Sequence, residues 1–100
     1  MEDRDYLILL YDYYGELFNN KQKEYFELYY FDNLSLGEIS ENLNISRNAV
    51  HKMVKFTENK LLFYEKKLKF FSKSNKILDV VKDISDDELR DKIINILKEE

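Results

Sequence analysis

The sequence contains no cysteine and no proline, and glycine occurs only twice among its 100 residues. The lack of cysteine excludes a disulfide framework and thiolate chemistry. The lack of proline and the scarcity of glycine remove most turn signals, and the apolar residues recur with helical rather than alternating spacing. These features predict one small all-α protein of about five helices.

Long apolar runs are also missing. No stretch approaches the roughly 18 apolar residues that a transmembrane helix requires. The chain starts with MEDRD, which is acidic and therefore the reverse of a signal peptide. We therefore expect no membrane insertion and a cytoplasmic location.

Signals of catalysis and of cofactor or metal binding are equally scarce. His51 is the only histidine, so no second histidine or cysteine is present to complete a metal site with it. Gly15 and Gly37 are isolated, so the chain has no glycine-rich phosphate loop. The acidic run at 86–88 lies in the first turn of a predicted helix, where the helix dipole favours negative charge. We therefore expect no catalytic residue, no cofactor and no metal, and we predict a non-enzymatic protein.

The segment SLGEISENLNISRNAVHKMV, from Ser35 to Val54, has the pattern of a helix-turn-helix. Ser35 is a good N-cap residue, and Glu38 three positions later completes a capping box. Asn44 tolerates the left-handed conformation that ends a helix. Ser46 then caps a second helix, which the pattern predicts to be the recognition helix.

This second helix carries six candidate DNA-binding residues, which are Ser46, Arg47, Asn48, His51, Lys52 and Lys55. The first residues of a recognition helix meet base edges in the major groove. Arginine reads guanine and asparagine reads adenine, so we expect Arg47, Asn48 and His51 to contact bases. We expect Lys52, Lys55 and the Ser46 hydroxyl to hold phosphates.

The charge is distributed unevenly along the chain, although the net charge is −4. Residues 1–45 carry ten acids and three bases, whereas residues 46–76 carry nine bases and two acids. Residues 77–100 carry eight acids and four bases. Positive charge concentrated on a recognition helix is typical of a DNA-reading element in an acidic protein.

No proline, glycine or cap interrupts the helix predicted from Ser46 to about Phe71. Its apolar residues follow a heptad-like spacing, which produces a seam that needs a partner. One candidate partner is the helix predicted over 5–18, and the other is a second copy of the chain. In the second case we expect a homodimer with an interface of Val54, Leu61, Tyr64, Leu68 and Phe71.

The remaining elements follow from capping and spacing. A capping box of Asn19 and Gln22 predicts a helix to about Phe31, and a further box of Ser85 and Glu88 predicts a C-terminal helix. The polar SKSN at 72–75 is the expected break after the long helix. These signals predict a domain over 1–76 and a C-terminal helical tail over 77–100, which packs on the long helix and brings its acids towards the lysines at 60–76.

The eight tyrosines and seven phenylalanines permit two interpretations. Exposed rings could form a surface that stacks on the bases of single-stranded nucleic acid. Their helical spacing favours the other interpretation, in which they form the core.

The run LSLGEISENLNISR resembles the fourth region of bacterial sigma factors. With its flanks, NKQKEYFELYYFDNLSLGEISENLNISRNAVHKMV is similar to the YlxM family of small bacterial proteins, and the similarity covers roughly residues 6 to 70. This resemblance implies a DNA-binding regulator linked to the signal recognition particle pathway. His51 and Lys52 stand where members of the family often have tyrosine and aspartate, which leaves the sequence preference open.

Two functions therefore remain as expectations. The first is a DNA-binding regulatory protein that reads duplex DNA and regulates or assists the signal recognition particle pathway. The second is an accessory module that contacts the RNA or a protein of that particle and uses the helix-turn-helix as a scaffold. The acidic first 45 residues favour the second function, because they limit the approach of DNA to one face.

Overall fold

The computed structural model describes residues 3–99, and this range contains only helices and their connections. The all-α prediction is confirmed. The elements are α1 (Arg4–Tyr14), η1 (Gly15–Leu17, a 3-10 helix), α2 (Asn20–Tyr30), α3 (Leu36–Leu43), α4 (Arg47–Leu68), α5 (Phe70–Val81) and α6 (Asp87–Lys98).

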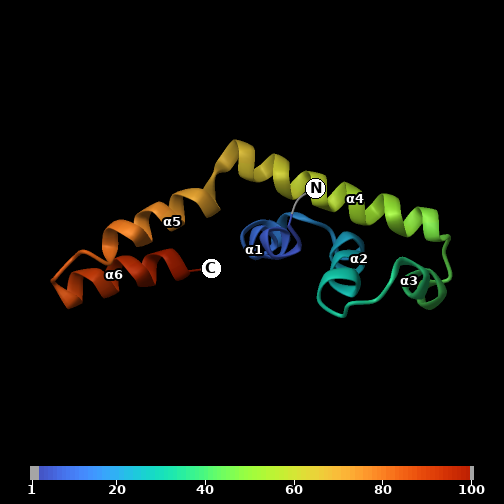
Figure 1. The fold of residues 1–100 in the computed structure, drawn as a ribbon, viewed down its shortest axis with the longest axis horizontal. Helices are drawn as coiled ribbons and strands as arrows, with labels where there is room; N and C mark the ends of the chain where they lie inside the picture. Colours follow the sequence, from blue (N-terminus) through green and yellow to red (C-terminus); the bar gives the residue numbers. More distant parts are fainter. Residues whose placement is uncertain (1–2, 100) are drawn as a thin grey trace. The chain divides into compact units, whose positions relative to one another are not determined.

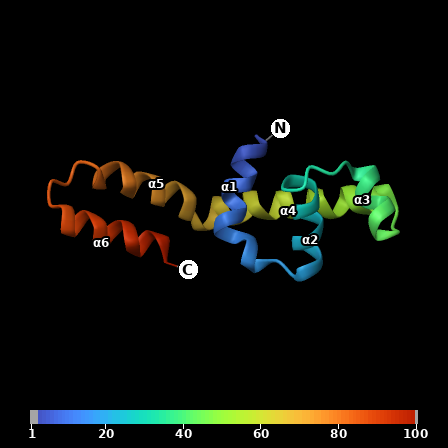
Figure 2. The ribbon, with the colours of Figure 1, turned by 90° about the horizontal axis from the view of Figure 1, so that it is seen from below.

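The chain divides into two compact units between Leu68 and Lys69. In the first unit, α1, α2 and α3 pack against α4, which is the longest helix (Figure 1). In the second unit, α5 and α6 pack against each other as a helical hairpin, and they lie side by side in both views (Figure 2). The predicted packing of a C-terminal tail on the first domain stays a prediction.

Aromatic rings make up much of the core of the first unit. The ring of Tyr11 stacks on Phe26 at 4.3 Å between centroids, and Phe26 stacks on Tyr30 at 4.4 Å. A Cβ atom at Gly15 would lie 3.2 Å from the ring of Tyr11, so glycine lets that ring lie against the end of α1. Complete burial of a large apolar side chain such as Phe26 contributes about 1.5–3 kcal/mol.

Side-chain caps determine where the helices start. The predicted box at α2 is confirmed, because Asn19 accepts the N–H of Gln22 at 2.8 Å and the Gln22 side chain accepts the N–H of Asn19 at 2.9 Å. The predicted box of Ser85 and Glu88 is wrong. Asp86 caps α6 instead, and its carboxylate accepts the N–H of Leu89 at 3.1 Å.

The break after the long helix lies at Lys69 and not at 72–75. Lys69 adopts a left-handed backbone conformation with φ of 59°, which ends α4 and precedes α5. The residues SKSN lie inside α5. The predicted single helix from Ser46 to Phe71 is therefore two helices, and Lys73 and Lys76 belong to the second unit.

Candidate nucleic-acid interface

The helix-turn-helix begins at Ser35, as the capping signal predicts. The Ser35 hydroxyl accepts the N–H of Glu38 at 3.1 Å, and the Glu38 carboxylate accepts the N–H of Ser35 at 3.0 Å. The hydrogen bond from the Ser35 backbone holds the pKa of Glu38 below its usual value, and the Ser35 side chain adds to this effect. The two reciprocal bonds fix the direction from which the chain enters α3.

The turn between α3 and α4 is held by local hydrogen bonds. Asn44 ends α3 in the left-handed conformation, with φ of 54°, and its N–H donates to the carbonyl of Ser40. The Ile45 N–H donates to the same carbonyl at 3.2 Å, and the Ser40 hydroxyl donates to the carbonyl of Ile45. Ser46 then starts α4, because its hydroxyl accepts the N–H of Ala49 at 3.0 Å. These bonds set the angle at which α4 leaves the turn.

The inward face of α4 is the one that its apolar spacing predicts. Val50 and Thr57 are fully buried, and Val54 is 4% exposed. The Thr57 hydroxyl donates to the carbonyl of Met53 at 3.1 Å, so this polar group is satisfied within the helix. Ile39 of α3 is also fully buried. This packing holds α3 and α4 as one rigid pair.

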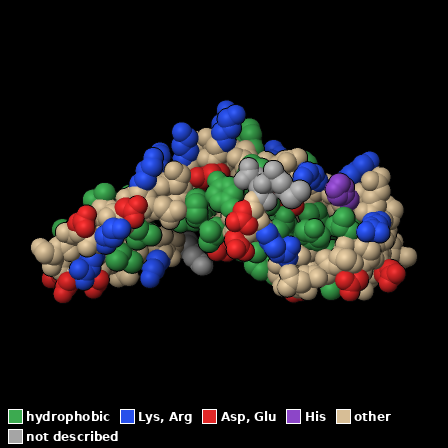
Figure 3. All heavy atoms as spheres, viewed as in Figure 1, with side chains coloured by type: hydrophobic (Ala, Val, Ile, Leu, Met, Phe, Trp, Pro, Cys, Tyr) green, Lys and Arg blue, Asp and Glu red, His purple; other side chains and the backbone are tan. Residues whose placement is uncertain are grey.

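The structure brings the six predicted DNA-binding residues together at the start of α4. All six are exposed, and they are Ser46, Arg47, Asn48, His51, Lys52 and Lys55. Figure 3 shows the imidazole of His51 among blue basic side chains over this part of the first unit. Their role in binding stays a prediction, but their exposure makes them accessible to a large ligand.

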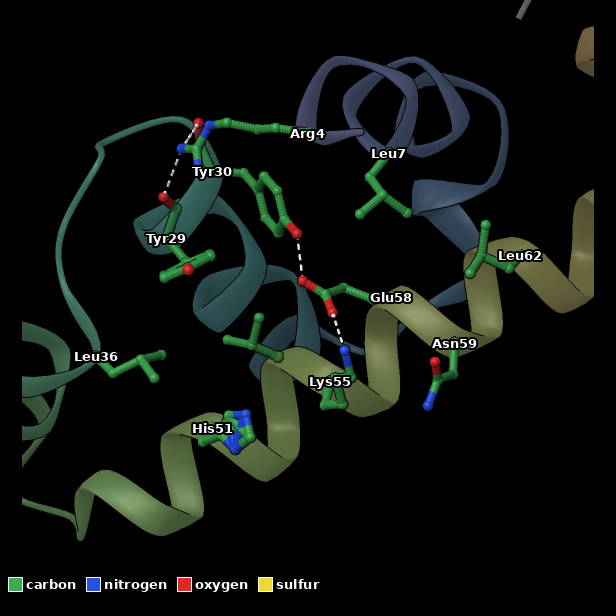
Figure 4. A pocket seen from close by; sticks show the side chains of 11 residues that line it. Arg4, Leu7, Tyr29, Tyr30, Leu36, His51, Lys55, Glu58, Asn59 and Leu62 are labelled. Atoms are coloured by element: carbon green, nitrogen blue, oxygen red, sulfur yellow. Dashed lines mark hydrogen bonds and ion pairs between the residues drawn. The ribbon is translucent and has the colours of Figure 1, made fainter. Parts of the chain in front are cut away.

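Both acidic residues of α4 are turned towards other helices of the first unit. The Tyr30 hydroxyl of α2 donates to the Glu58 carboxylate, whose other oxygen lies 3.6 Å from the Lys55 ammonium (Figure 4). The Tyr14 hydroxyl of α1 donates to Glu65 at 2.6 Å, and Glu65 is only 7% exposed. The outward face of α4 therefore presents basic and neutral side chains along its whole length.

A cleft of about 380 Å³ lies beside these bonds, between α4 and the three helices packed on it. His51 and Lys55 line it on α4, and Arg4 lines it on α1 (Figure 4). Arg4 donates to the carbonyls of Tyr29 and Tyr30 at 2.9 Å each, so it caps the C-terminal end of α2. Burial, and next the bond to Glu58, raises the pKa of Tyr30. The hydroxyl of Tyr30 is therefore a stable hydrogen-bond donor at neutral pH.

From its middle to its C-terminal end, α4 carries exposed rings next to ammonium groups. Phe56 is 46% exposed and Phe63 is 48% exposed. The Lys60 ammonium lies 5.2 Å from the centre of the Phe63 ring and 6.0 Å from that of Phe56, and the Lys67 ammonium lies 5.9 Å from Phe63. We call Phe56, Lys60, Phe63 and Lys67 the aromatic–lysine stripe. The interpretation of the aromatic residues as core is wrong for these two phenylalanines.

The residues predicted for a dimer interface lie in different environments. Val54 and Leu61 are buried by the chain itself, so they are not accessible to a second copy in this fold. Tyr64 is half-buried, and its ring lies 5.8 Å from that of Tyr14 and 5.9 Å from that of Phe18. Leu68 is exposed, and Phe71 lies on α5 of the second unit. Other helices of the first unit therefore cover Val54, Leu61 and part of Tyr64, while the homodimer itself stays a prediction.

Three residues that sequence reasoning missed shape this region. Glu58 and Glu65 lie four positions after the buried Val54 and Leu61, so helical spacing places each acid beside the seam. The only sequence signal for the partners of Glu58 and Glu65 was the large number of tyrosines in α1 and α2, whose hydroxyls can donate to a carboxylate. Arg4 gave no such signal, because its bonds to α2 join positions 25 and 26 residues apart.

Neither a metal cluster nor a membrane span is found in the part of the chain that the structure describes. Within residues 3–99, no three histidine, cysteine or acidic side chains form a group that could hold a metal ion. No helix in the same range is long and apolar enough to cross a membrane.

The capped α3, the left-handed turn and the exposed face of α4 define a helix-turn-helix protein. The chain belongs to the UPF0122 family, whose model matches residues 1–100 and is described as "Putative helix-turn-helix protein, YlxM / p13 like". A UPF0122 protein of Caldanaerobacter subterraneus is 44% identical over 85 residues, which is 85% of this chain and 73% of the relative. A UPF0122 protein of Malacoplasma penetrans is 40% identical over 92 residues, which is 92% of this chain and 86% of the relative. The resemblance to the YlxM family is therefore confirmed.

Proposed function

We propose that this protein is a non-enzymatic, DNA-binding regulatory protein, and that the first half of α4 enters the major groove of duplex DNA. The observation that supports this proposal is that the exposed face of α4 carries basic side chains and no exposed acid. Its two acids, Glu58 and Glu65, are bonded to tyrosines of α1 and α2, while its basic side chains lie outward. Phosphate contacts supply most of the affinity of such proteins for DNA, and a face without acids favours these contacts.

The exposed residues divide into two roles in this proposal. Arg47, Asn48 and His51 meet base edges, because the N-terminal residues of a recognition helix reach deepest into the groove. Lys52 holds a phosphate, as does Ser46, whose hydroxyl accepts a backbone N–H and still has its own hydrogen to donate. Lys55 is shared between a phosphate and Glu58, which lies 3.6 Å away.

The role in the signal recognition particle pathway, as regulator or accessory factor, is part of the same proposal. It is supported by the family resemblance alone and adds no residue to the site.

Mobility of a random duplex in gels across a salt series tests the phosphate contacts. Lys52→Ala and Lys55→Ala should weaken binding to all duplexes alike, and each should reduce the slope of log affinity against log salt by about one. Lys21→Ala is the matched control, because Lys21 is exposed on α2 and lies outside the proposed interface. It should leave the slope unchanged.

Contacts to bases need a separate measurement, on a duplex that has been selected from random sequences for tight binding. Arg47→Ala should relax the preference at one base pair and cost about 1–3 kcal/mol there. If Arg47, Lys52 and Lys55 can all be replaced without a change in affinity, the DNA proposal is wrong.

The aromatic–lysine stripe favours a second candidate function, the binding of RNA with unpaired bases. Exposed rings stack on bases, and neighbouring lysines attract the phosphates. Phe63→Ala should then weaken binding to the RNA of the signal recognition particle by about 1–3 kcal/mol per stacked base, without affecting duplex DNA. The same gels with both ligands decide between the two functions. If the protein binds neither ligand, the remaining function is that of an accessory module that contacts a protein of the signal recognition particle.

A further inference from the structure

The hairpin of α5 and α6 has an exposed apolar face. Ile77, Val80, Ile84 and Ile93 line a groove of about 350 Å³ between the two helices. Leu89 and Ile96 lie about one turn to either side of Ile93 on α6, so they extend the same face. We call these six residues the hairpin face. Val80 is 67% exposed and Ile96 is 63% exposed, so the face is open to a partner.

The hairpin has almost no core of its own. Within its described residues, only Val81 is a buried apolar residue. About 30 residues are too few to bury an adequate core in isolation. A contiguous apolar surface on so small a unit is typical of an interaction site.

The sign of the charge changes from one end of the hairpin to the other. Residues 69–76, at the start of α5, carry three lysines and no acid. Residues 82–88, around the turn into α6, carry four acids and one lysine. The end of α6 lies beside the start of α5 (Figure 2), and the charges of Lys98 and Glu99 there cancel, so the two ends of the hairpin are of opposite sign. Two such hairpins in antiparallel orientation place each basic end against an acidic end.

We propose that the hairpin face binds the hairpin face of a second copy, and that the two hairpins form an antiparallel four-helix bundle. A two-fold axis makes the same patch serve both copies, as in most homodimers. Apolar burial holds the pair, while the exposed charges orient it. This inference does not depend on nucleic-acid binding.

The size of the face sets the expected affinity. A helix of 12 residues such as α5 is about 18 Å long, and two adjacent helices are roughly 20 Å wide. This footprint of roughly 360 Å² per copy is smaller than that of standard specific interfaces, so we expect a weak, reversible dimer with a dissociation constant of about 10–100 µM.

Light scattering on the full 100-residue protein, over about 1 to 200 µM at low salt, tests the proposal. The mean mass of the natural sequence should rise from one chain towards two. Val80→Asp should stay monomeric throughout this range, and so should Ile96→Asp. Leu17→Asp is the control, because Leu17 is 58% exposed in the first unit, and it should dimerise like the natural sequence. Far-ultraviolet circular dichroism checks that each variant keeps its helix content.

Charge reversal provides a rescue experiment. Lys73→Glu with Lys76→Glu should weaken the dimer about tenfold at low salt, and so should Asp83→Lys with Glu88→Lys. The protein with all four substitutions should recover the dimer, because the two ends are again of opposite sign. If this fourfold variant keeps its helix content but does not recover the dimer, the antiparallel arrangement is overturned.

Two results overturn the proposal itself. A natural sequence that stays monomeric up to about 200 µM would show that a second copy does not occupy the face, leaving cover by the chain's own first unit as the alternative. A dimer that survives both Val80→Asp and Ile96→Asp would show that the copies meet through another surface.

Discussion

The two units have similar helix content but different sources of stability. Of the twelve apolar residues buried within the described range, eleven lie in the first unit and only Val81 lies in the hairpin. In the hairpin the apolar residues are at most half-buried apart from Val81, beside the Asp86 cap and exposed ion pairs such as Lys92 with Glu88, which are 3.6 Å apart. Exposed pairs contribute about 0–1 kcal/mol each. The comparison teaches that helix content says little about how independently a segment can fold.

The largest expected loss of stability comes from a substitution in the core of the first unit. Leu10→Ala should destabilise the first unit by about 2–5 kcal/mol, because Leu10 is fully buried in α1. Leu89→Ala makes the same chemical change in the hairpin, where Leu89 is 48% exposed, and should cost less than about 0.5 kcal/mol. Urea denaturation at a concentration that keeps the copies apart measures both values. Equal losses would mean that the hairpin has a core of comparable strength.

A smaller effect should come from the buried hydrogen bond that joins α1 to α4. Tyr14→Phe removes the donor 2.6 Å from the buried Glu65 carboxylate and should cost about 1–3 kcal/mol. Tyr11→Phe is the control, because the Tyr11 hydroxyl donates to the exposed Glu27 at 2.7 Å. Its loss should be below about 1 kcal/mol. If the two variants lose equal stability in the same urea titration, burial of the carboxylate is not what gives the bond its strength.

The smallest effect is an alkaline pH dependence confined to the first unit, which contains all eight tyrosines. Burial and the bond to Glu58 raise the pKa of Tyr30, while tyrosines of the unfolded chain lose their protons near pH 10. The stabilisation is therefore complete below about pH 10 and is lost as the pH rises further. Between pH 10 and 11, Tyr30 should account for about 1 kcal/mol of this loss.

Urea midpoints at pH 9, 10 and 11 measure this dependence. Tyr30→Phe should show a shallower decline than the natural sequence, and the lysines common to both proteins provide an identical background. Parallel declines would show that the phenol of Tyr30 is no harder to ionise in the folded chain.

Local signals predicted much of the first unit. Ser35 with Glu38 and Asn19 with Gln22 mark helix starts, because a cap involves residues only three positions apart. The same logic failed at Ser85, since the adjacent Asp86 is an equally good cap and its carboxylate reaches Leu89. Helical spacing also identified which residues of α4 face outward, although it does not test what they bind.

Long-range features were not predictable in the same way. Spacing showed that Leu61 lies on a buried seam, but it did not show whether the same chain or a second copy covers that seam. Helical spacing places Glu65 beside the seam, but it does not identify its partner Tyr14, which is 51 positions away. Lys69 ends α4 without glycine or asparagine, the residues that normally signal a left-handed stop.

The two tyrosine–glutamate bonds of α4 would also link folding to the proposed binding of nucleic acid. In an unfolded chain, Glu58 and Glu65 are no longer held against α1 and α2, and their carboxylates stand among the lysines of the same segment. Folding holds these carboxylates against α1 and α2, away from the exposed face of α4. If that face binds a polyanion, as proposed, the folded chain should attract it more strongly than the unfolded chain does. A polyanion that binds this face only in the folded state would therefore stabilise the first unit. Its melting temperature would then rise as the polyanion concentration increases.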